Sequence, residues 1–365
     1  MLKNHRVASV LGLAAVTSLT LAACSEGGGD STSEVEGLTE VTGELRGEGA
    51  TSQQRAMDYF ATLYEETGST LSYNATGSGS GQTQFISGLV HFAGSDSPLA
   101  NKDGEDQVAA AKERCGGNDA WHLPMVIGPV AIAYNLEGVD LNLTPALVAQ
   151  IFDGKITKWN DEMIQEANEG TELPDKDINV VFRSEESGTS DNFMKFLSAA
   201  APEDWDHEPS KSFPSGVGQG ANGSAGVVDE VSKIDGAITY VESGFAKDKN
   251  LGVAKLDFGH GPVELNRDSV GMALDNVEFV TEGHDMVVDS ESLFAMDQEG
   301  AYPLVLTTYE IVCSAGYDEQ TRDLLKNFFT VVLEAGQGQE LEDLGYIPLQ
   351  GEFKDKIAAA VEAIS

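Results

Sequence analysis

Basic residues are scarce in this chain of 365 residues, where 22 Lys and Arg stand against 60 Asp and Glu and leave a formal net charge of -38. A surface with this balance repels nucleic acid and anionic membranes, so neither is expected as a direct partner. The same field repels a small anion at long range. An anion site in this chain must therefore rely on donors placed close to the ligand.

Apolar runs long enough to span a membrane are absent. The run at 7–19 follows two basic residues and is followed by Leu-Ala-Ala-Cys, which is the order of a secretory signal. The cysteine after Leu-Ala-Ala resembles a bacterial lipobox, in which that residue becomes the lipidated start of the mature protein. We expect a signal peptide over 1–23 and a lipid anchor on Cys24, which would hold the exported protein at the outer face of the cytoplasmic membrane. The alternative is a plain signal peptide with an incidental cysteine.

Histidine and cysteine are few as well. The six histidines show no pairing at the spacing of metal ligands, so the sequence predicts neither a metal centre nor a cofactor. Residues 24–42 are rich in Gly, Ser, Thr and Glu, which is typical of a flexible tether. Beyond it, Cys115 and Cys313 favour one disulfide, because the chain is expected to be exported; two buried free thiols are the alternative.

Strand-like and helix-like segments alternate through the rest of the chain, which indicates an α/β fold. The expected strands are 70–74, 92–95, 121–134, 178–182, 236–241 and 302–312. The expected helices follow Gln54, Gly81, Asp103, Thr144, Thr189, Gly223 and Thr321. Two strands, 121–134 and 302–312, are long enough to cross between domains, and the chain length suggests two domains.

Three helix starts carry small polar residues, at 49–52, 77–81 and 187–189. A helix N-terminus has unpaired N–H groups and a partial positive charge, so it attracts a small anion. Arg183 adds a planar fork of donors that suits phosphate or carboxylate. Asp96 would repel a bare anion but can accept a proton from a protonated oxyanion, which favours phosphate over sulfate.

Each of these motifs also has an ordinary structural interpretation. The helix starts are then simple caps or flexible turns, the arginine forms a surface ion pair, and the aspartate caps a loop. A fourth Gly-rich helix start, at 216–223, is interpreted as a site of close backbone packing.

Together the motifs resemble the phosphate-binding protein of bacterial high-affinity phosphate ABC importers. The resemblance rests on Gly-Glu-Gly-Ala-Thr at 47–51, Gly-Ser-Gly-Ser-Gly at 77–81, Phe-Ala-Gly-Ser-Asp at 92–96 and Arg-Ser-Glu-Glu-Ser-Gly-Thr at 183–189, and it extends to 126–130, 151–159 and 236–242. It covers about residues 43–350.

The resemblance implies an α/β, two-lobed periplasmic-binding-protein fold of type II, with a ligand cleft between the lobes and two crossover strands. It implies a first lobe of residues 43–131 plus 304–365 and a second lobe of residues 132–303. The implied function is extracytoplasmic binding of inorganic phosphate, by a monomer, and delivery to the permease subunits of an ABC importer.

The resemblance also implies the phosphate ligands, which are Thr51, Ser52, Ser78, Asp96, Arg183, Ser187, Gly188 and Thr189. Asp96 would accept the proton of the ligand, and Arg183 would pair with its negative charge. Four positions depart from the common pattern of the family. Ser52 stands where Phe is frequent, and His91 stands where an acidic residue is frequent. Glu185 stands where Asp is frequent, and Glu186 stands where Gly is frequent.

Two other functions are compatible with the same motifs. One is binding of another tetrahedral oxyanion, such as sulfate, which the carboxylate of Asp96 argues against. The other is a phosphatase with Ser187 as its nucleophile. A serine nucleophile needs a base, and the sequence has no Gly-x-Ser-x-Gly elbow, so we do not expect an enzyme.

Overall fold

The computed structural model describes residues 35–102, 105–214, 216–275 and 277–365, and residues 35–365 form one unit. The expected signal peptide and Cys24 lie outside the described residues. The described end of the expected tether, residues 35–42, is not free. Leu38 and Val41 pack against the core, and Thr39 exchanges two backbone hydrogen bonds with the Asn327 side chain.

Strands and helices alternate in the first part of the chain. Three parallel strands stand side by side there, β1 (Glu44–Gly49), β2 (Thr70–Ala75) and β3 (Phe92–Ser95). Their helices are α1 (Gln54–Glu65), α2 (Ser78–Ile86) and α3 (Gln107–Arg114). Successive side chains of a strand face opposite sides of the sheet. Accordingly Phe92 packs on Phe328, while its neighbour Ala93 lies in a separate cluster with Phe85.

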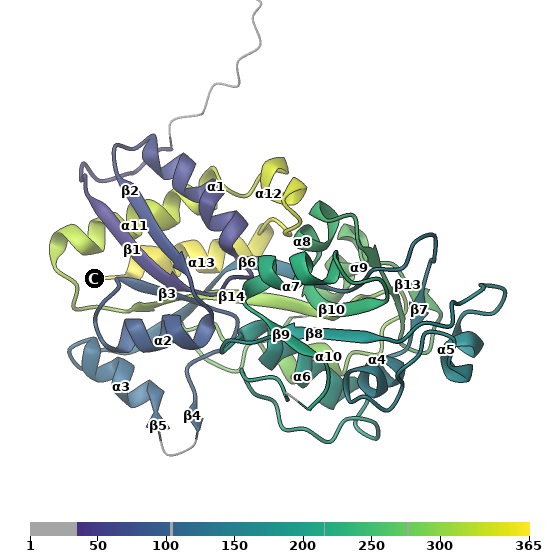
Figure 1. The fold of residues 1–365 in the computed structure, drawn as a ribbon. Coiled ribbons are helices and arrows are strands. Elements are labelled where there is room, and N and C mark those ends of the chain that lie inside the picture. Colours follow the sequence, from purple (N-terminus) through teal and green to yellow (C-terminus); the bar gives the residue numbers. More distant parts are fainter. Residues whose placement is uncertain (1–34, 103–104, 215, 276) are drawn as a thin grey trace, which may run out of the picture. The chain divides into compact units, whose positions relative to one another are not determined.

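Two long antiparallel strands, β6 (Ala120–Tyr134) and β14 (Val305–Cys313), connect the two halves of the main sheet (Figure 1). The sheet order is β2-β1-β3-β14-β6-β10-β8-β9, with β11 also paired to β6. β6 pairs with β14 as far as Pro129 and with β10 from Val130 onward. The predicted crossover strands are therefore confirmed, and the fold is the two-lobed α/β fold of periplasmic binding proteins.

The second half repeats the strand–helix pattern. Its strands in the main sheet are β8 (Asn179–Arg183), β9 (Gln219–Ala221), β10 (Ala237–Glu242) and β11 (Gly252–Val253). Its helices are α4 (Pro145–Phe152), α5 (Glu162–Ala167), α6 (Gly188–Ala200), α7 (Gly223–Val231), α8 (Ser243–Asp248), α9 (Arg267–Leu274) and α10 (Ser290–Phe294). A small separate sheet contains β7 (Asn142–Leu143), β12 (Lys255–Asp257) and β13 (Pro262–Val263).

The C-terminal part returns to the first half through β14. It consists of α11 (Glu319–Glu334), α12 (Gln339–Asp343) and α13 (Gly351–Ala363). The expected disulfide is present and joins Cys115, at the end of α3, to Cys313, at the end of β14, with Cα atoms 5.4 Å apart. None of the helices in the described part of the chain is both long and apolar enough to cross a membrane.

Several elements differ from the sequence predictions, and the short helices α5, α9, α10 and α12 were not predicted. The helix expected from Asp103 begins at Gln107, because β4 (Asn101–Lys102) and β5 (Glu105–Asp106) form a hairpin before it. The capping side chain of Asp106 then fixes the helix start by accepting a bond from Ala109 N. β1 and α13 were not predicted.

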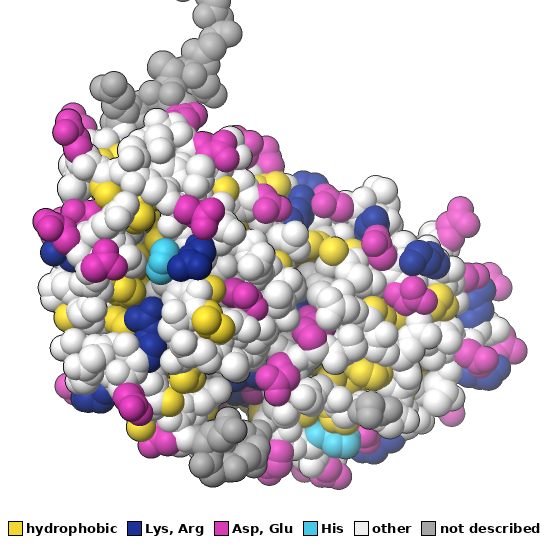
Figure 2. Space-filling view, turned by 60° about the vertical axis from the view of Figure 1, so that its left-hand side comes forward, with side chains coloured by type: hydrophobic (Ala, Val, Ile, Leu, Met, Phe, Trp, Pro, Cys, Tyr) yellow, Lys and Arg dark blue, Asp and Glu magenta, His cyan; other side chains and the backbone are white. Residues whose placement is uncertain are grey.

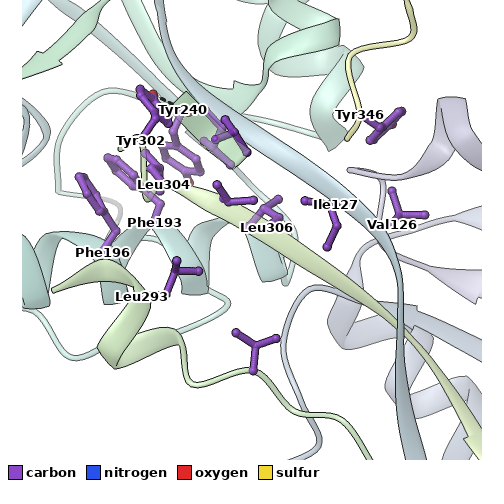
Figure 3. Close-up of a cluster of buried hydrophobic side chains, with 14 of the residues drawn as sticks. Val126, Ile127, Phe193, Phe196, Tyr240, Leu293, Tyr302, Leu304, Leu306 and Tyr346 are labelled. Carbon is purple, nitrogen blue, oxygen red and sulfur yellow. Dashed lines mark hydrogen bonds between the residues drawn. The ribbon is translucent and has the colours of Figure 1, made fainter. Parts of the chain in front are cut away.

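An aromatic core holds α6 against β10 (Figure 3). Phe193 stacks on Tyr240 with ring centroids 4.3 Å apart and planes at 15°. Phe196, one turn along the helix, meets Phe294 edge to face. Burying such rings contributes about 3 to 5 kcal/mol each, so this core fixes the position of the helix N-terminus. The Tyr240 hydroxyl also accepts a bond from Arg183 N, which ties the core to the end of β8.

Candidate functional site

Arg183 is the last residue of β8, and its side chain is only 2% exposed. Its guanidinium donates from Nε and Nη2 to the same oxygen of Glu185, from Nη1 to Thr189 and Ser224, and from Nη2 to Thr51. Burial alone would lower the pKa of Arg183. The negative charges of Glu185 and Glu242 outweigh burial, so the pKa lies above its ordinary value. The site therefore contains a permanent buried cation with a fixed orientation.

The N-terminus of α6 lies directly beside this cation. Ser187 is the N-cap, and its Oγ accepts a bond from Ser190 N at 3.2 Å. Gly188 follows, at a point where a side chain has no room: a Cβ there would lie 2.5 Å from Ser78 Oγ and 2.7 Å from Asp96 Cβ. The absence of a side chain lets the helix start approach the opposite half of the sheet.

Asp96 directly follows β3 and is 4% exposed. Its Oδ1 accepts bonds from Ser52 Oγ at 2.7 Å and Thr308 Oγ1 at 2.8 Å, and its Oδ2 accepts a longer one from Thr189 at 3.3 Å. Burial, reinforced by the charge of Glu242, raises the pKa of Asp96 from 3.8 to about 6. At neutral pH most of this carboxyl group is still ionised and can accept hydrogen bonds.

Ser78 begins α2 and lies against Asp96, whose backbone N donates to Ser78 Oγ at 3.1 Å. Asn192, on α6, donates to the backbone oxygen of Asp96 at 2.6 Å. All eight residues predicted as ligands thus lie in one buried cluster. They come from the ends of β1, β3 and β8 and from the helices that follow these strands.

This cluster combines a guanidinium, several hydroxyls and three helix N-termini around the carboxylate of Asp96, with Glu185 and Glu242 beside it. Donors of these kinds suit a small oxyanion. Among the described residues, no group of three or more His, Cys, Asp or Glu is placed to hold a metal ion.

Comparison with known proteins agrees with this geometry. The sequence model of the PBP superfamily domain matches residues 34–335. Phosphate-binding protein PstS 2 of Mycobacterium tuberculosis is 43% identical over 375 residues, covering 100% of both chains. Phosphate-binding protein PstS 3 of the same species is 40% identical over 376 residues, again covering 100% of both. The chain belongs to the PstS family of phosphate-binding proteins.

A solved structure shows the same fold. A high-affinity periplasmic phosphate-binding protein, PfluDING, bound with phosphate, superposes with a TM-score of 0.70 at 23% identity, covering 87% of this chain and 93% of that one. At this level of identity the likeness supports the fold of this PstS-family chain and says nothing of single residues.

In this PstS-family chain, the start of α7 also belongs to the cluster, which the sequence analysis missed. Ser224 N donates to Thr51 Oγ1 at 3.1 Å, and Ser224 Oγ accepts from Arg183 at 3.2 Å. The interpretation of 216–223 as close packing holds for Gly218, where a Cβ would lie 2.2 Å from Val180 O, and for Gly220, where it would lie 2.9 Å from Ser184 Cβ. The signal was present, since Asn-Gly-Ser at 222–224 has the small polar residues of the other helix starts.

Glu185 and Glu186, which depart from the family pattern, lie at the edge of the cluster. Glu185 binds the guanidinium of Arg183 and accepts the backbone N of Gly223 at 3.1 Å on both oxygens. It therefore orients the cation and links it to α7. The backbone oxygen of Glu186 accepts a bond from Gly79 N at 3.1 Å, which joins the starts of α6 and α2.

Ser52 and His91 are the other departures. The hydroxyl of Ser52 donates a hydrogen bond to Asp96, which a phenylalanine at this position could not do. His91 lies outside the cluster and accepts a bond from Arg46 N at 3.1 Å through Nδ1.

Proposed function

We propose that this chain binds inorganic phosphate outside the cytoplasm and delivers it to an ABC-type phosphate importer. The observation that carries the proposal is a single buried cluster in which Thr189 contacts both the cation of Arg183 and the carboxylate of Asp96. A ligand that both carries negative charge and donates a proton matches this pair. The membership of the PstS family supports the same ligand.

The eight predicted residues have distinct proposed roles toward phosphate. Arg183 neutralises charge, and the first N–H groups of α6 at Gly188 and Thr189 bind a second side of the anion. The hydroxyl groups of Thr51, Ser78 and Ser187 provide further donors, and Ser52 contributes its backbone N–H, because its hydroxyl is bonded to Asp96.

Asp96 is the residue that selects phosphate in this proposal. Phosphate carries one or two protons near neutral pH, and one of them can be donated to the ionised carboxylate. Sulfate has none and would face an uncompensated buried charge, which costs several kcal/mol.

The lobe boundaries remain part of the proposal, with residues 43–131 plus 304–365 in the first lobe and 132–303 in the second. Two observations support them: β6 changes its pairing partner at Val130, and β14 begins at Val305. We also propose that the chain is exported, is anchored through a lipid on Cys24, and acts as a monomer.

We propose that the chain binds phosphate without turning it over. The relatives are binding proteins by name, and Ser187 Oγ serves as a helix cap. The test combines calorimetric titration of phosphate, with sulfate as competitor, and incubation with a chromogenic phosphate ester. Tight phosphate binding without ester hydrolysis is expected; preferential sulfate binding, or hydrolysis that Ser187→Ala abolishes, would contradict the proposal.

Replacing the selecting carboxylate tests its role directly. Asp96→Asn adds an N–H donor where the phosphate proton is to be accepted, so we expect selectivity for phosphate over sulfate to fall by about tenfold or more, or ~1.4 kcal/mol. Competition calorimetry measures the ratio of the two affinities. Asp119→Asn, on the surface, is the matched control, and equal selectivity in the Asp96 variant and the parent would exclude the role.

A further inference from the structure

Glu242, the last residue of β10, is a second carboxyl group in the cluster and is 1% exposed. Its Oε1 accepts a bond from Thr189 Oγ1 at 2.8 Å. Its Oε2 is fully buried and has no hydrogen-bond partner among the described residues. A buried carboxylate oxygen without a donor is unfavourable, so it calls for a partner outside the chain.

The hydroxyl of Thr189 cannot supply all the donors that its neighbours need. It accepts a bond from Arg183 Nη1 at 3.1 Å and lies within bonding distance of Asp96 Oδ2 at 3.3 Å and Glu242 Oε1 at 2.8 Å. A hydroxyl has a single proton, so it donates to one carboxylate at a time. Two carboxylate oxygens, Asp96 Oδ2 and Glu242 Oε1, therefore share one donor, and Glu242 Oε2 has no donor among the described residues.

The charges around Glu242 also favour a protonated ligand. From the neighbouring elements, Asp96, Arg183 and Tyr346 interact with it electrostatically. Arg183 is already paired with Glu185, so the cluster contains one cation and three carboxyl groups. Each proton on an incoming anion removes one unit of negative charge from a site that already holds an excess of it.

We propose that Glu242 is a second acceptor for a ligand proton, so that the site binds dihydrogen phosphate in preference to the dianion. Asp96 accepts one P–OH group and Glu242 accepts the other through Oε2. This inference rests on the proposed phosphate function and refines it. Glu242 acts as a specificity-determining residue for the protonation state of the ligand.

The number of protons taken up when phosphate binds distinguishes a site with one acceptor for ligand protons from a site with two. At mildly alkaline pH free phosphate is mostly the dianion, which carries one proton. If Asp96 alone accepted a proton, the dianion would bind as it is. If Glu242 accepts a second one, the complex must take up about one proton from the buffer for each phosphate bound.

Calorimetric titration of the purified protein with inorganic phosphate, in buffers of different protonation enthalpy, measures this uptake. We expect close to one proton for the parent protein at mildly alkaline pH and clearly less for Glu242→Gln. Phosphate affinity of the parent should fall by up to about tenfold per pH unit in this range, and that of the variant less steeply. The surface variant Glu65→Gln should behave as the parent.

The outcomes separate the two proposals. A parent protein that binds no phosphate contradicts the phosphate function itself. A parent that binds phosphate without proton uptake overturns only the inference on Glu242, even where Glu242→Gln does not fold. Uptake and pH slope that are equal in the parent and a folded Glu242→Gln variant also overturn it, because the second proton then lies elsewhere.

Discussion

At the residue scale, a third buried carboxyl group lies behind the cluster. Glu310, on β14, is fully buried, and both of its oxygens lack a hydrogen-bond partner among the described residues, as does Gln53 Oε1. Burial, reinforced by the charge of Asp96, raises the pKa of Glu310 well above its ordinary value of 4.5. Glu310 therefore holds its proton to a higher pH than an exposed glutamate does.

This protonated acid has a stability consequence. The folded chain keeps a proton on Glu310 that the unfolded chain releases once the pH rises above about 4.5. The free energy of unfolding thus decreases as the pH rises above about 4.5, by at most ~1.4 kcal/mol per pH unit for one group, until the folded chain also loses the proton. Glu310→Gln has no proton to lose, so its stability relative to the parent should improve as the pH rises.

Urea unfolding of both proteins from about pH 5 to about pH 8 checks this. Glu65→Gln, on the exposed side of α1, should give the curve of the parent. A difference between Glu310→Gln and the parent that stays constant over the pH range would mean that Glu310 is already ionised, and the account would fail.

At the scale of elements, the site lies where parallel strands end. β1 and β3 run parallel, as do β8 and β10, and the chain leaves each of them toward the cluster. Binding sites of α/β sheets commonly form at such carboxyl ends, because the following helices begin there. The sheet thus brings the N-termini of α2, α6 and α7 to one place.

The close approach of α6 to α2 can be tested at Gly188. In Gly188→Ala the added methyl group would meet Ser78 Oγ and Asp96 Cβ, so the helix start must move away from Asp96. We expect phosphate affinity to fall by about tenfold or more, or ~1.4 kcal/mol, when measured by calorimetry.

Gly271→Ala, in α9, is the matched control, because a Cβ there meets nothing within 4 Å. It should leave affinity unchanged and stabilise the chain by up to about 1 kcal/mol, as alanine does in helices. Unchanged phosphate affinity in Gly188→Ala would show that the contact is not needed for binding.

At the scale of the whole molecule, charge is spread and not concentrated. On the face drawn in Figure 2, acidic side chains lie scattered among basic and neutral ones. With a net charge of -38, the protein as a whole repels anions, while its cation at Arg183 is buried. Long-range attraction therefore does not bring phosphate to the site, and the selectivity depends on contacts made after arrival.

The proposed lipid anchor is also a property of the whole protein. Cys24→Ser removes the only thiol that the signal sequence places at the mature N-terminus, so we expect the protein to leave the membrane fraction and lose the mass of the lipid. Cell fractionation and intact mass measure both effects. Ser25→Ala should stay attached, and a Cys24 variant that remains equally attached would contradict the anchor.

The sequence by itself determined the elements whose signals are local. The strand, polar turn and helix around Arg183, the Gly-rich start of α2 and the two crossover strands are all as predicted, since propensity, capping and periodicity act over a few residues. Resemblance to the family then predicted eight ligand positions, which the structure brings together in one cluster and which remain a proposal.

Only the tertiary structure decided which other side chains join the cluster. Thr308 and Glu242 have no local signal for binding, because each reaches the cluster through strand pairing or packing with a distant segment. The ionisation of Asp96 and Glu310 depends in the same way on burial among elements far apart in the chain. Local sequence sets which donors exist, but burial and proximity set which carboxylates need a proton from the ligand.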